Sequence, residues 1–117
     1  MKIYLAGPMT GLPHFNFPAF HAAAERLRAG GHEVFDPAAR DIERHGRDIS
    51  ADNPAGCQAL AEKNHGFDIR AAMADNMEWI CREAEAIALL PGWQNSRGAL
   101  AEKSLAEALK IKVIFLD

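Results

Sequence analysis

The chain lacks the features that would place it in several large protein classes. It has two cysteines in 117 residues, Cys57 and Cys81, and they form neither a CxxC nor a CxxH spacing. A disulfide framework or a zinc site of the common kinds is therefore not expected. Its five histidines are scattered and include no HExxH motif, so we expect no bound metal.

Long apolar runs and basic clusters are also missing. No stretch approaches the roughly 20 apolar residues of a membrane-spanning helix, and the N-terminus enters a strand-like segment without a basic and apolar leader. We therefore expect a cytoplasmic protein without a membrane partner. The formal net charge is −3, so a nucleic acid polymer is not an expected partner either. No Gly-Lys-Ser or Gly-Lys-Thr is present, which excludes a Walker loop.

The composition that remains is that of an ordinary globular domain. Hydrophobic residues make up 49% and charged residues 25% of the chain, and this length suits one domain over residues 1–117. Four short apolar runs are expected to be strands: Lys2–Ala6, His32–Asp36, Ala86–Leu90 and Lys112–Leu116. Helical segments alternate with them. This order predicts an α/β fold with a flavodoxin-like or Rossmann-like parallel sheet of at least four strands and helices on both faces.

The helical segments begin at Phe17, near Phe67 and at Ser96. The apolar period of the second one favours Met73, Met77 and Cys81 as core residues. Residues Ala38–Gly66 are polar and are predicted to form an irregular insert, with short helical stretches at Ala39–His45 and Cys57–Lys63. A connection of this length acts as a lid, an oligomer contact or a mobile loop, and the sequence leaves these alternatives open.

The most informative segment runs from Pro91 to Glu102. It joins the apolar run Ala86–Leu90 to a helix ending near Leu109, and ligands bind at such turns in open parallel sheets. A helical wheel places Glu102 on the flank of the packed face, which we predict to comprise Ala101, Ser104, Leu105, Ala108 and Leu109. A carboxylate in this position is a candidate for chemistry. The alternative is a boundary residue whose head group extends to water.

Two turns supply candidate ligand-binding residues. In Gly7-Pro8-Met9-Thr10-Gly11-Leu12-Pro13, two glycines and two prolines prevent regular structure and let the backbone approach a ligand. In the second turn, Ser96 at a helix N-cap, beside Arg97 and the amides of Gly98 and Ala99, suits an anion, although a plain cap is the alternative. Three flanking residues are further candidates to line the pocket: Met9, Asn16 and Trp93. The last is alternatively a packing or dimer contact.

Three motifs in this order resemble a known group of proteins. They are Tyr4-Leu-Ala-Gly-Pro8, an acidic residue on the helix before the third strand, and Ser96-x-Gly98-x-x-x-Glu102. Together they are similar to the nucleoside 2-deoxyribosyltransferase-like superfamily, which includes the 2'-deoxynucleoside 5'-monophosphate N-glycosidases. The start Ala6-Gly-Pro-Met-Thr-Gly-Leu12 and the turn Pro91-Gly-Trp-x-x-Ser-x-Gly-Ala99 are also similar to a branch of small phage or prophage proteins of unassigned function.

The resemblance implies an N-glycosidic bond hydrolase or transferase acting on a (deoxy)nucleoside or nucleoside 5'-monophosphate. Glu102 matches the nucleophile that attacks the anomeric carbon, and Tyr4 matches the hydroxyl that orients it. Asp75 is the best match to the second carboxylate, with Asp68 and Glu78 as competitors on the same helix. Ser96 departs from the Asp of the transferases and matches the Ser that helps the N-glycosidases to bind the 5'-phosphate.

The resemblance also bears on assembly. The family completes its pockets with a neighbouring subunit, so we expect a homodimer or a higher homo-oligomer with Ala38–Gly66 or Trp93 near the contact. No cofactor is implied. The alternative function is a non-catalytic module that binds or sequesters a nucleotide. Tyr4 together with Glu102 favours the enzyme, because a sequestering protein has no need for a carboxylate at the anomeric carbon.

Overall fold

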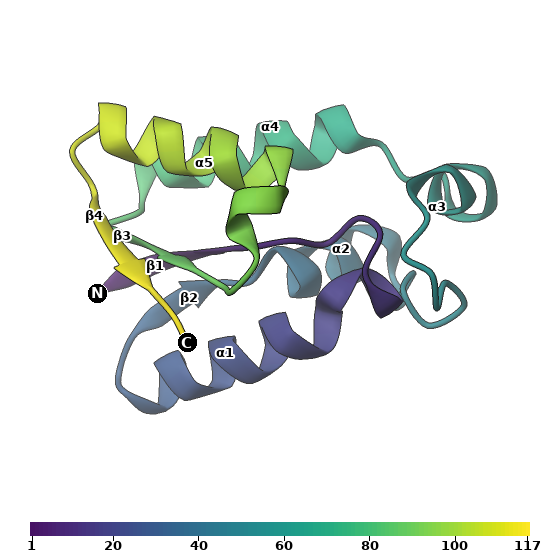
Figure 1. Cartoon of the computed structure of the whole chain (residues 1–117), viewed down its shortest axis with the longest axis horizontal. Helices are drawn as coiled ribbons and strands as arrows, with labels where there is room; N and C mark the ends of the chain where they lie inside the picture. The colour runs from purple at the N-terminus through teal and green to yellow at the C-terminus, as the bar shows by residue number, and fades with distance from the viewer.

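The computed structural model describes residues 1–117 and contains one parallel sheet (Figure 1). Its strands are β1 (Lys2–Ala6), β2 (Glu33–Phe35), β3 (Ala86–Leu89) and β4 (Lys112–Phe115). They lie in the order β2-β1-β3-β4, and each neighbouring pair is parallel. This is the order of the first four strands of a flavodoxin-like sheet. The predicted α/β fold and the four predicted strands are confirmed.

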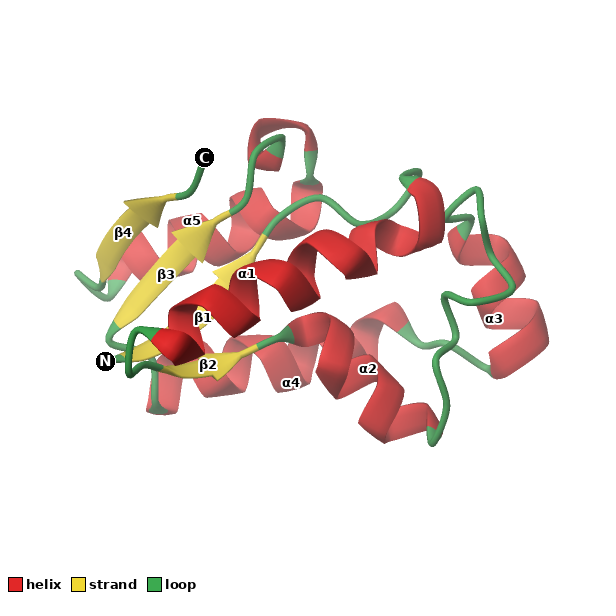
Figure 2. Ribbon diagram, turned by 90° about the horizontal axis from the view of Figure 1, so that it is seen from below, coloured by secondary structure: helices red, strands yellow, loops and turns green.

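Helices cover both faces of the sheet, as predicted. The long helices are α1 (Phe17–Ala29), α4 (Ile69–Arg82) and α5 (Arg97–Ala108). Figures 1 and 2 show α1 on one face and both α4 and α5 on the other. The side chains of β1 alternate accordingly. Ile3 and Leu5 belong to the core cluster of α1, whereas Tyr4 and Ala6 belong to the cluster of α4 and α5.

The segment after β2 contains α2 (Pro37–His45) and α3 (Gln58–His65), which confirm the short helical stretches predicted at Ala39–His45 and Cys57–Lys63. The residues between the two helices are irregular, as predicted. The helix α2 forms because Asp36 accepts a hydrogen bond from the amide of Ala38 and Pro37 occupies the first turn. Both helices lie beyond the carboxyl end of the sheet (Figure 2).

The loop between α2 and α3 is fixed to the loop after β1. The amide of Gly11 donates to the carbonyl of Gly56 at 2.8 Å, and Nδ1 of His14 lies 2.7 Å from the carbonyl oxygen of Ser50. Gly56 has a φ of +64°, and a Cβ there would lie 2.1 Å from the carbonyl oxygen of Leu12. Only glycine fits this close approach.

The predicted packed face of α5 is wrong. Ala101, Ser104, Ala108 and Leu109 are exposed, Leu105 is half-buried, and the buried residues are Ala99, Glu102 and Ala106. Alanine and leucine occur on every side of this helix, so its sequence carries little directional signal. Glu102 therefore lies in the middle of the packed face and not on its flank.

The helix α4 has a corresponding shift. Its buried residues are Ala72, Asn76 and Ile80, and Cys81 is exposed, contrary to the prediction of a core cysteine. Met73 and Met77 are half-buried. None of the helices combines the length and the apolar character required to cross a membrane.

Candidate functional site

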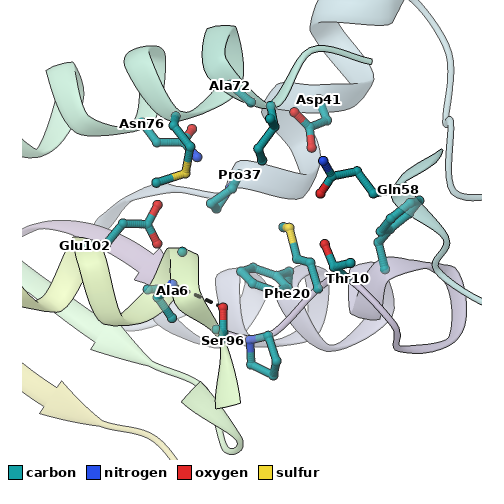
Figure 3. A pocket seen from close by; sticks show the side chains of 18 of the residues that line it. Ala6, Thr10, Phe20, Pro37, Asp41, Gln58, Ala72, Asn76, Ser96 and Glu102 are labelled. Carbon is teal, nitrogen blue, oxygen red and sulfur yellow. Dashed lines mark hydrogen bonds between the residues drawn. The ribbon is translucent and has the colours of Figure 1, made fainter. Parts of the chain in front are cut away.

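A cavity of about 680 Å³ lies at the carboxyl ends of β1 and β3 (Figure 3). These strands lead to helices on opposite faces of the sheet, and such a switch point is the usual ligand site of an open parallel sheet. The two loops that follow them meet there. A Cβ on Gly92 would lie 3.2 Å from the ring of Pro8, and a Cβ on Gly7 would lie 2.7 Å from the Cβ atom of Leu90. The two turns that supply the candidate ligand-binding residues therefore meet at this edge of the sheet.

Tyr4 and Glu102 come together in one wall of this cavity. The Tyr4 hydroxyl donates a hydrogen bond of 2.5 Å to Oε2 of Glu102, and the two residues come from β1 and α5. Tyr4 is fully buried, and Glu102 is 5% exposed. The predicted contact between the two side chains is therefore present.

Burial dominates the electrostatics of this pair. It raises the pKa of Glu102 to about 7, and the hydrogen bond from Tyr4 and the amide of Asn76 act in the opposite direction. The pKa of Tyr4 is also raised, first by burial and then by the neighbouring Glu102 charge. The tyrosine therefore stays protonated at neutral pH and serves as a donor, while the glutamate exchanges a proton near neutrality.

The N-terminus of α5 forms a second part of the wall. Ser96, Arg97 and Gly98 all line the cavity, as predicted for substrate-binding residues. The Ser96 hydroxyl accepts a hydrogen bond from the amide of Ala99 at 3.1 Å, so it caps the helix and that amide is not free. The amides of Arg97 and Gly98 make no hydrogen bond within the chain and remain available to an anion.

The loop after β1 contributes Gly7, Pro8 and Met9 to the cavity. Asn16, the other candidate from this region, does not line it. Its amide donates to the carbonyl of Pro8 at 3.0 Å and thereby supports the loop from behind. His14, Phe15 and Asn16 all have positive φ angles between 51° and 60°, an uncommon and strained backbone for three successive residues other than glycine.

Asp75, predicted as the second carboxylate, does not reach the cavity. Its oxygens accept hydrogen bonds from Arg40 at 2.8 and 3.2 Å and from Arg44 at 2.9 Å. These bonds hold the pKa of Asp75 below its usual range. The position next to it, Asn76, faces the cavity instead, because successive helical residues point about 100° apart.

Trp93 also lies outside the cavity lining. Its ring packs against Phe115 with 5.8 Å between centroids, and the ammonium group of Lys103 lies 5.3 Å from the ring centroid. Trp93 was predicted to line the pocket or to make a packing or dimer contact, and the structure shows packing and no pocket lining.

The wall opposite Glu102 was not predicted. Asp41 of α2 and Gln58 of α3 face the cavity from that side (Figure 3). The cavity lining is also rich in aromatic side chains, which are Phe15, Phe17, Phe20 and Phe67. The arrangement suits a flat, partly polar molecule that carries a negative charge at one end.

A sequence signal for Asn76 and Asp41 exists in hindsight. Asn76 stands between Ala72 and Ile80, four residues from each, on the buried stripe of its helix. Asp41 follows the buried Pro37 by four residues in α2. In both cases a polar residue lies four residues from a buried apolar residue, and this spacing places both on the same face of the helix.

Comparison with known proteins gives one match. No curated protein matches the chain, and no solved structure does so either. A family model described as a domain of unknown function (DUF4406) matches residues 1–115. Because this match covers nearly the whole chain, the protein belongs to the DUF4406 family.

Proposed function

We propose that this protein hydrolyses or transfers at the N-glycosidic bond of a (deoxy)nucleoside 5'-monophosphate, with Glu102 as the nucleophile. The proposal places it in the nucleoside 2-deoxyribosyltransferase-like superfamily, on the motifs described above. One observation carries it: a buried carboxylate, held by a buried tyrosine, in the wall of a cavity at the switch point of the sheet. A carboxylate without a function is seldom buried away from any basic partner.

The chemistry requires an anion at the anomeric carbon. The glycosidic bond breaks through an oxocarbenium-like state, which a carboxylate stabilises and then traps as a glycosyl ester. The base leaves with the electron pair of the C–N bond and takes up a proton. Water then replaces Glu102 on the sugar and releases one proton in turn, so hydrolysis balances. In transfer, a second base takes the place of this water.

Tyr4 orients the nucleophile. Its single donor binds Oε2 of Glu102, which leaves Oε1 for the attack on the anomeric carbon. The same bond stabilises the ionised form of Glu102, because the pKa of this carboxyl group would rise further without it. The ionised fraction at neutral pH therefore depends on Tyr4.

The start of α5 is proposed to hold the 5'-phosphate. The free amides of Arg97 and Gly98 and the positive end of the helix dipole attract an anion there, and Arg97 adds a charge. Glu102 lies in the second turn of the same helix. One rigid element would thus set the distance between the phosphate and the reacting sugar carbon.

The test is release of free base from a panel of nucleosides and 5'-monophosphates, followed by chromatography. We expect the wild type to release base and Glu102→Gln to release none, because the amide keeps the shape but cannot act as the anion. Glu107→Gln is the matched control, since Glu107 is an exposed glutamate on the same helix. Tight nucleotide binding without base release from any compound would reject the enzyme and support the binding module.

The phosphate site has its own test. A Cβ on Gly98 would lie 3.9 Å from both Met73 Sδ and Ser96 Oγ, two residues of the cavity lining, so the chain itself has room for it. We expect Gly98→Ala to fold normally and to weaken the binding of 5'-monophosphates more than that of nucleosides. Equal weakening of both ligand classes would place the phosphate elsewhere.

We further propose that the protein works as a homodimer or a larger homo-oligomer. The edge strand β4 has a free side, and Phe115 on it is 61% exposed beside Trp93. Burial of such an aromatic pair against a second copy would be favourable. Light scattering at working concentration tests this, and a monomeric mass for the wild type would refute it.

A further inference from the structure

Asp41 is a buried carboxyl group with one oxygen left free. It is 8% exposed, and its Oδ1 accepts a hydrogen bond of 2.5 Å from Nη1 of Arg44. The other amino group of Arg44 binds Asp75, so the guanidinium is fixed from both sides. The Oδ2 atom of Asp41 accepts no hydrogen bond within the chain, and the residue lines the cavity.

The charge state of Asp41 follows from this pairing. Burial raises the pKa of this carboxyl group above its ordinary value, and the adjacent Arg44 cation offsets part of that rise. With the guanidinium hydrogen-bonded directly to Oδ1, we take the group as a carboxylate, which can only accept hydrogen bonds. Its free oxygen therefore requires a donor from the ligand.

Gln58 supplies the complementary group. It lines the same cavity, and Figure 3 shows Gln58 and Asp41 both facing the cavity from the side opposite Glu102. Its Nε2 atom makes one long contact of 3.3 Å to Glu62, which leaves a hydrogen for a ligand. The same side of the cavity thus offers the acceptor of Asp41 and the donor of Gln58.

We propose that Asp41 and Gln58 recognise a nucleobase with an amino group next to an unprotonated ring nitrogen, as in adenine or cytosine. Asp41 accepts from the amino group, and Gln58 donates to the ring nitrogen. The phenylalanines of the cavity lining contact the face of the base. This assignment rests on the proposed function, because it takes the ligand to be a nucleotide.

Bases with an oxo group in that position are excluded by the same geometry. In hypoxanthine or uracil, the amino group is replaced by a carbonyl oxygen and the ring nitrogen carries a hydrogen. The carboxylate would then face another acceptor, and the Gln58 donor would face another donor. A site built around buried hydrogen-bonding groups rejects such a mismatch strongly.

The experiment compares nucleotides that differ in this group alone. The pairs are dAMP with dIMP and dCMP with dUMP, titrated calorimetrically into Glu102→Gln so that no base is released during the measurement. We expect the amino member of at least one pair to bind about 10- to 100-fold more tightly than its oxo partner. Equal affinities within both pairs, or no binding of any of the four, would overturn the assignment.

Asp41→Asn in the same background gives the sharper result. Arg44 has donors only, so it holds the carbonyl oxygen of the new amide and turns its NH₂ group toward the cavity. The acceptor becomes a donor, and the preference should shift toward dIMP or dUMP. The matched control is Glu43→Gln, which removes an exposed charge from the same helix and should leave the preference unchanged. A preference that survives Asp41→Asn would place base recognition elsewhere.

A second variant tests the same assignment even if Asp41→Asn does not fold. Gln58→Met keeps the length of the side chain and removes the donor, and it should weaken dAMP or dCMP at least about fivefold and the oxo nucleotides much less. Equal effects on both would reject the assignment. These outcomes are separate from those of the proposed function: base release without amino preference refutes only the assignment, whereas amino preference without base release refutes only the enzyme.

Discussion

The burial of Glu102 has a consequence for stability that does not depend on any substrate. Its pKa in the folded protein is about 7, whereas its ordinary value is 4.5, and the largest cause is burial. The folded state therefore favours the protonated form. The contribution of Glu102 to stability is greatest below about pH 4.5, and it declines as the pH rises through 7, because the unfolded chain ionises this group more easily.

The size of the effect follows from the two pKa values. A difference of about 2.5 units, at 1.36 kcal/mol per unit, gives about 3 kcal/mol of lost stability once the pH is well above 7. Glu102→Gln removes the ionisation and keeps an acceptor for the Tyr4 hydroxyl. We therefore expect the variant to match the wild type near pH 4 and to be more stable by up to about 3 kcal/mol at pH 8.

Urea unfolding followed by circular dichroism at pH 4, 6 and 8 measures this difference. For a chain of this size, the midpoint of thermal unfolding at pH 8 should rise by roughly 10 °C. The control Glu107→Gln is exposed on the same helix and should show no such trend with pH. The reasoning would be refuted if the gain in unfolding free energy of Glu102→Gln over the wild type were no larger at pH 8 than at pH 4. Ionisation of Glu102 would then not destabilise the folded protein.

Further outcomes concern the same site and its supporting loop. Base release by the wild type should increase with pH up to about 7 and then level off, because the nucleophile must be ionised; a rate that falls over this range would contradict the role of Glu102. Tyr4→Phe removes a hydrogen bond that lowers the Glu102 pKa, so the rising limb of the profile should move to higher pH; an unchanged midpoint would show that the hydroxyl has no part in it. Gly56→Ala should destabilise the protein by more than about 1 kcal/mol in urea unfolding, because its Cβ would collide with the Leu12 carbonyl, and Gly46→Ala, which shares the positive φ but has no neighbour within 4 Å, separates the collision from the backbone strain.

The strands and the Tyr4–Glu102 pair were predictable from the sequence for a physical reason. The central strands β1 and β3 are buried on both faces, so each appears as an uninterrupted apolar run. Parallel strands bring their carboxyl ends to one edge, and that fixes which loops meet. The topology of the backbone alone therefore places the start of α5 beside the loop after β1.

Two other polar residues of the cavity, Asn76 and Asp41, were not predictable in the same way. Asp75 and Asn76 are neighbours in sequence, and only the orientation of α4 decides which one enters the cavity. That orientation depends on how the helix packs, since α4 has apolar or small residues on more than one side. Asp41 belongs to a segment without strands, so no sheet edge constrained its place. Its partner Arg44, three residues further along α2, is itself bound by Asp75 of α4, a contact between elements that the sequence does not reveal.

Two polar residues in the cavity wall, Glu102 and Asn76, share a local setting that explains why helices carry them inward. Glu102 stands between the buried Ala99 and Ala106, and Asn76 is four residues after the buried Ala72. Alanine on the same stripe leaves space that a larger side chain would fill, so the polar group faces a void and not a packed core. Each such group destabilises the folded state unless it is satisfied, and in Glu102 that cost appears as the raised pKa. A ligand that supplies the missing partners would recover part of it, which links the stability of the protein to the occupancy of its cavity.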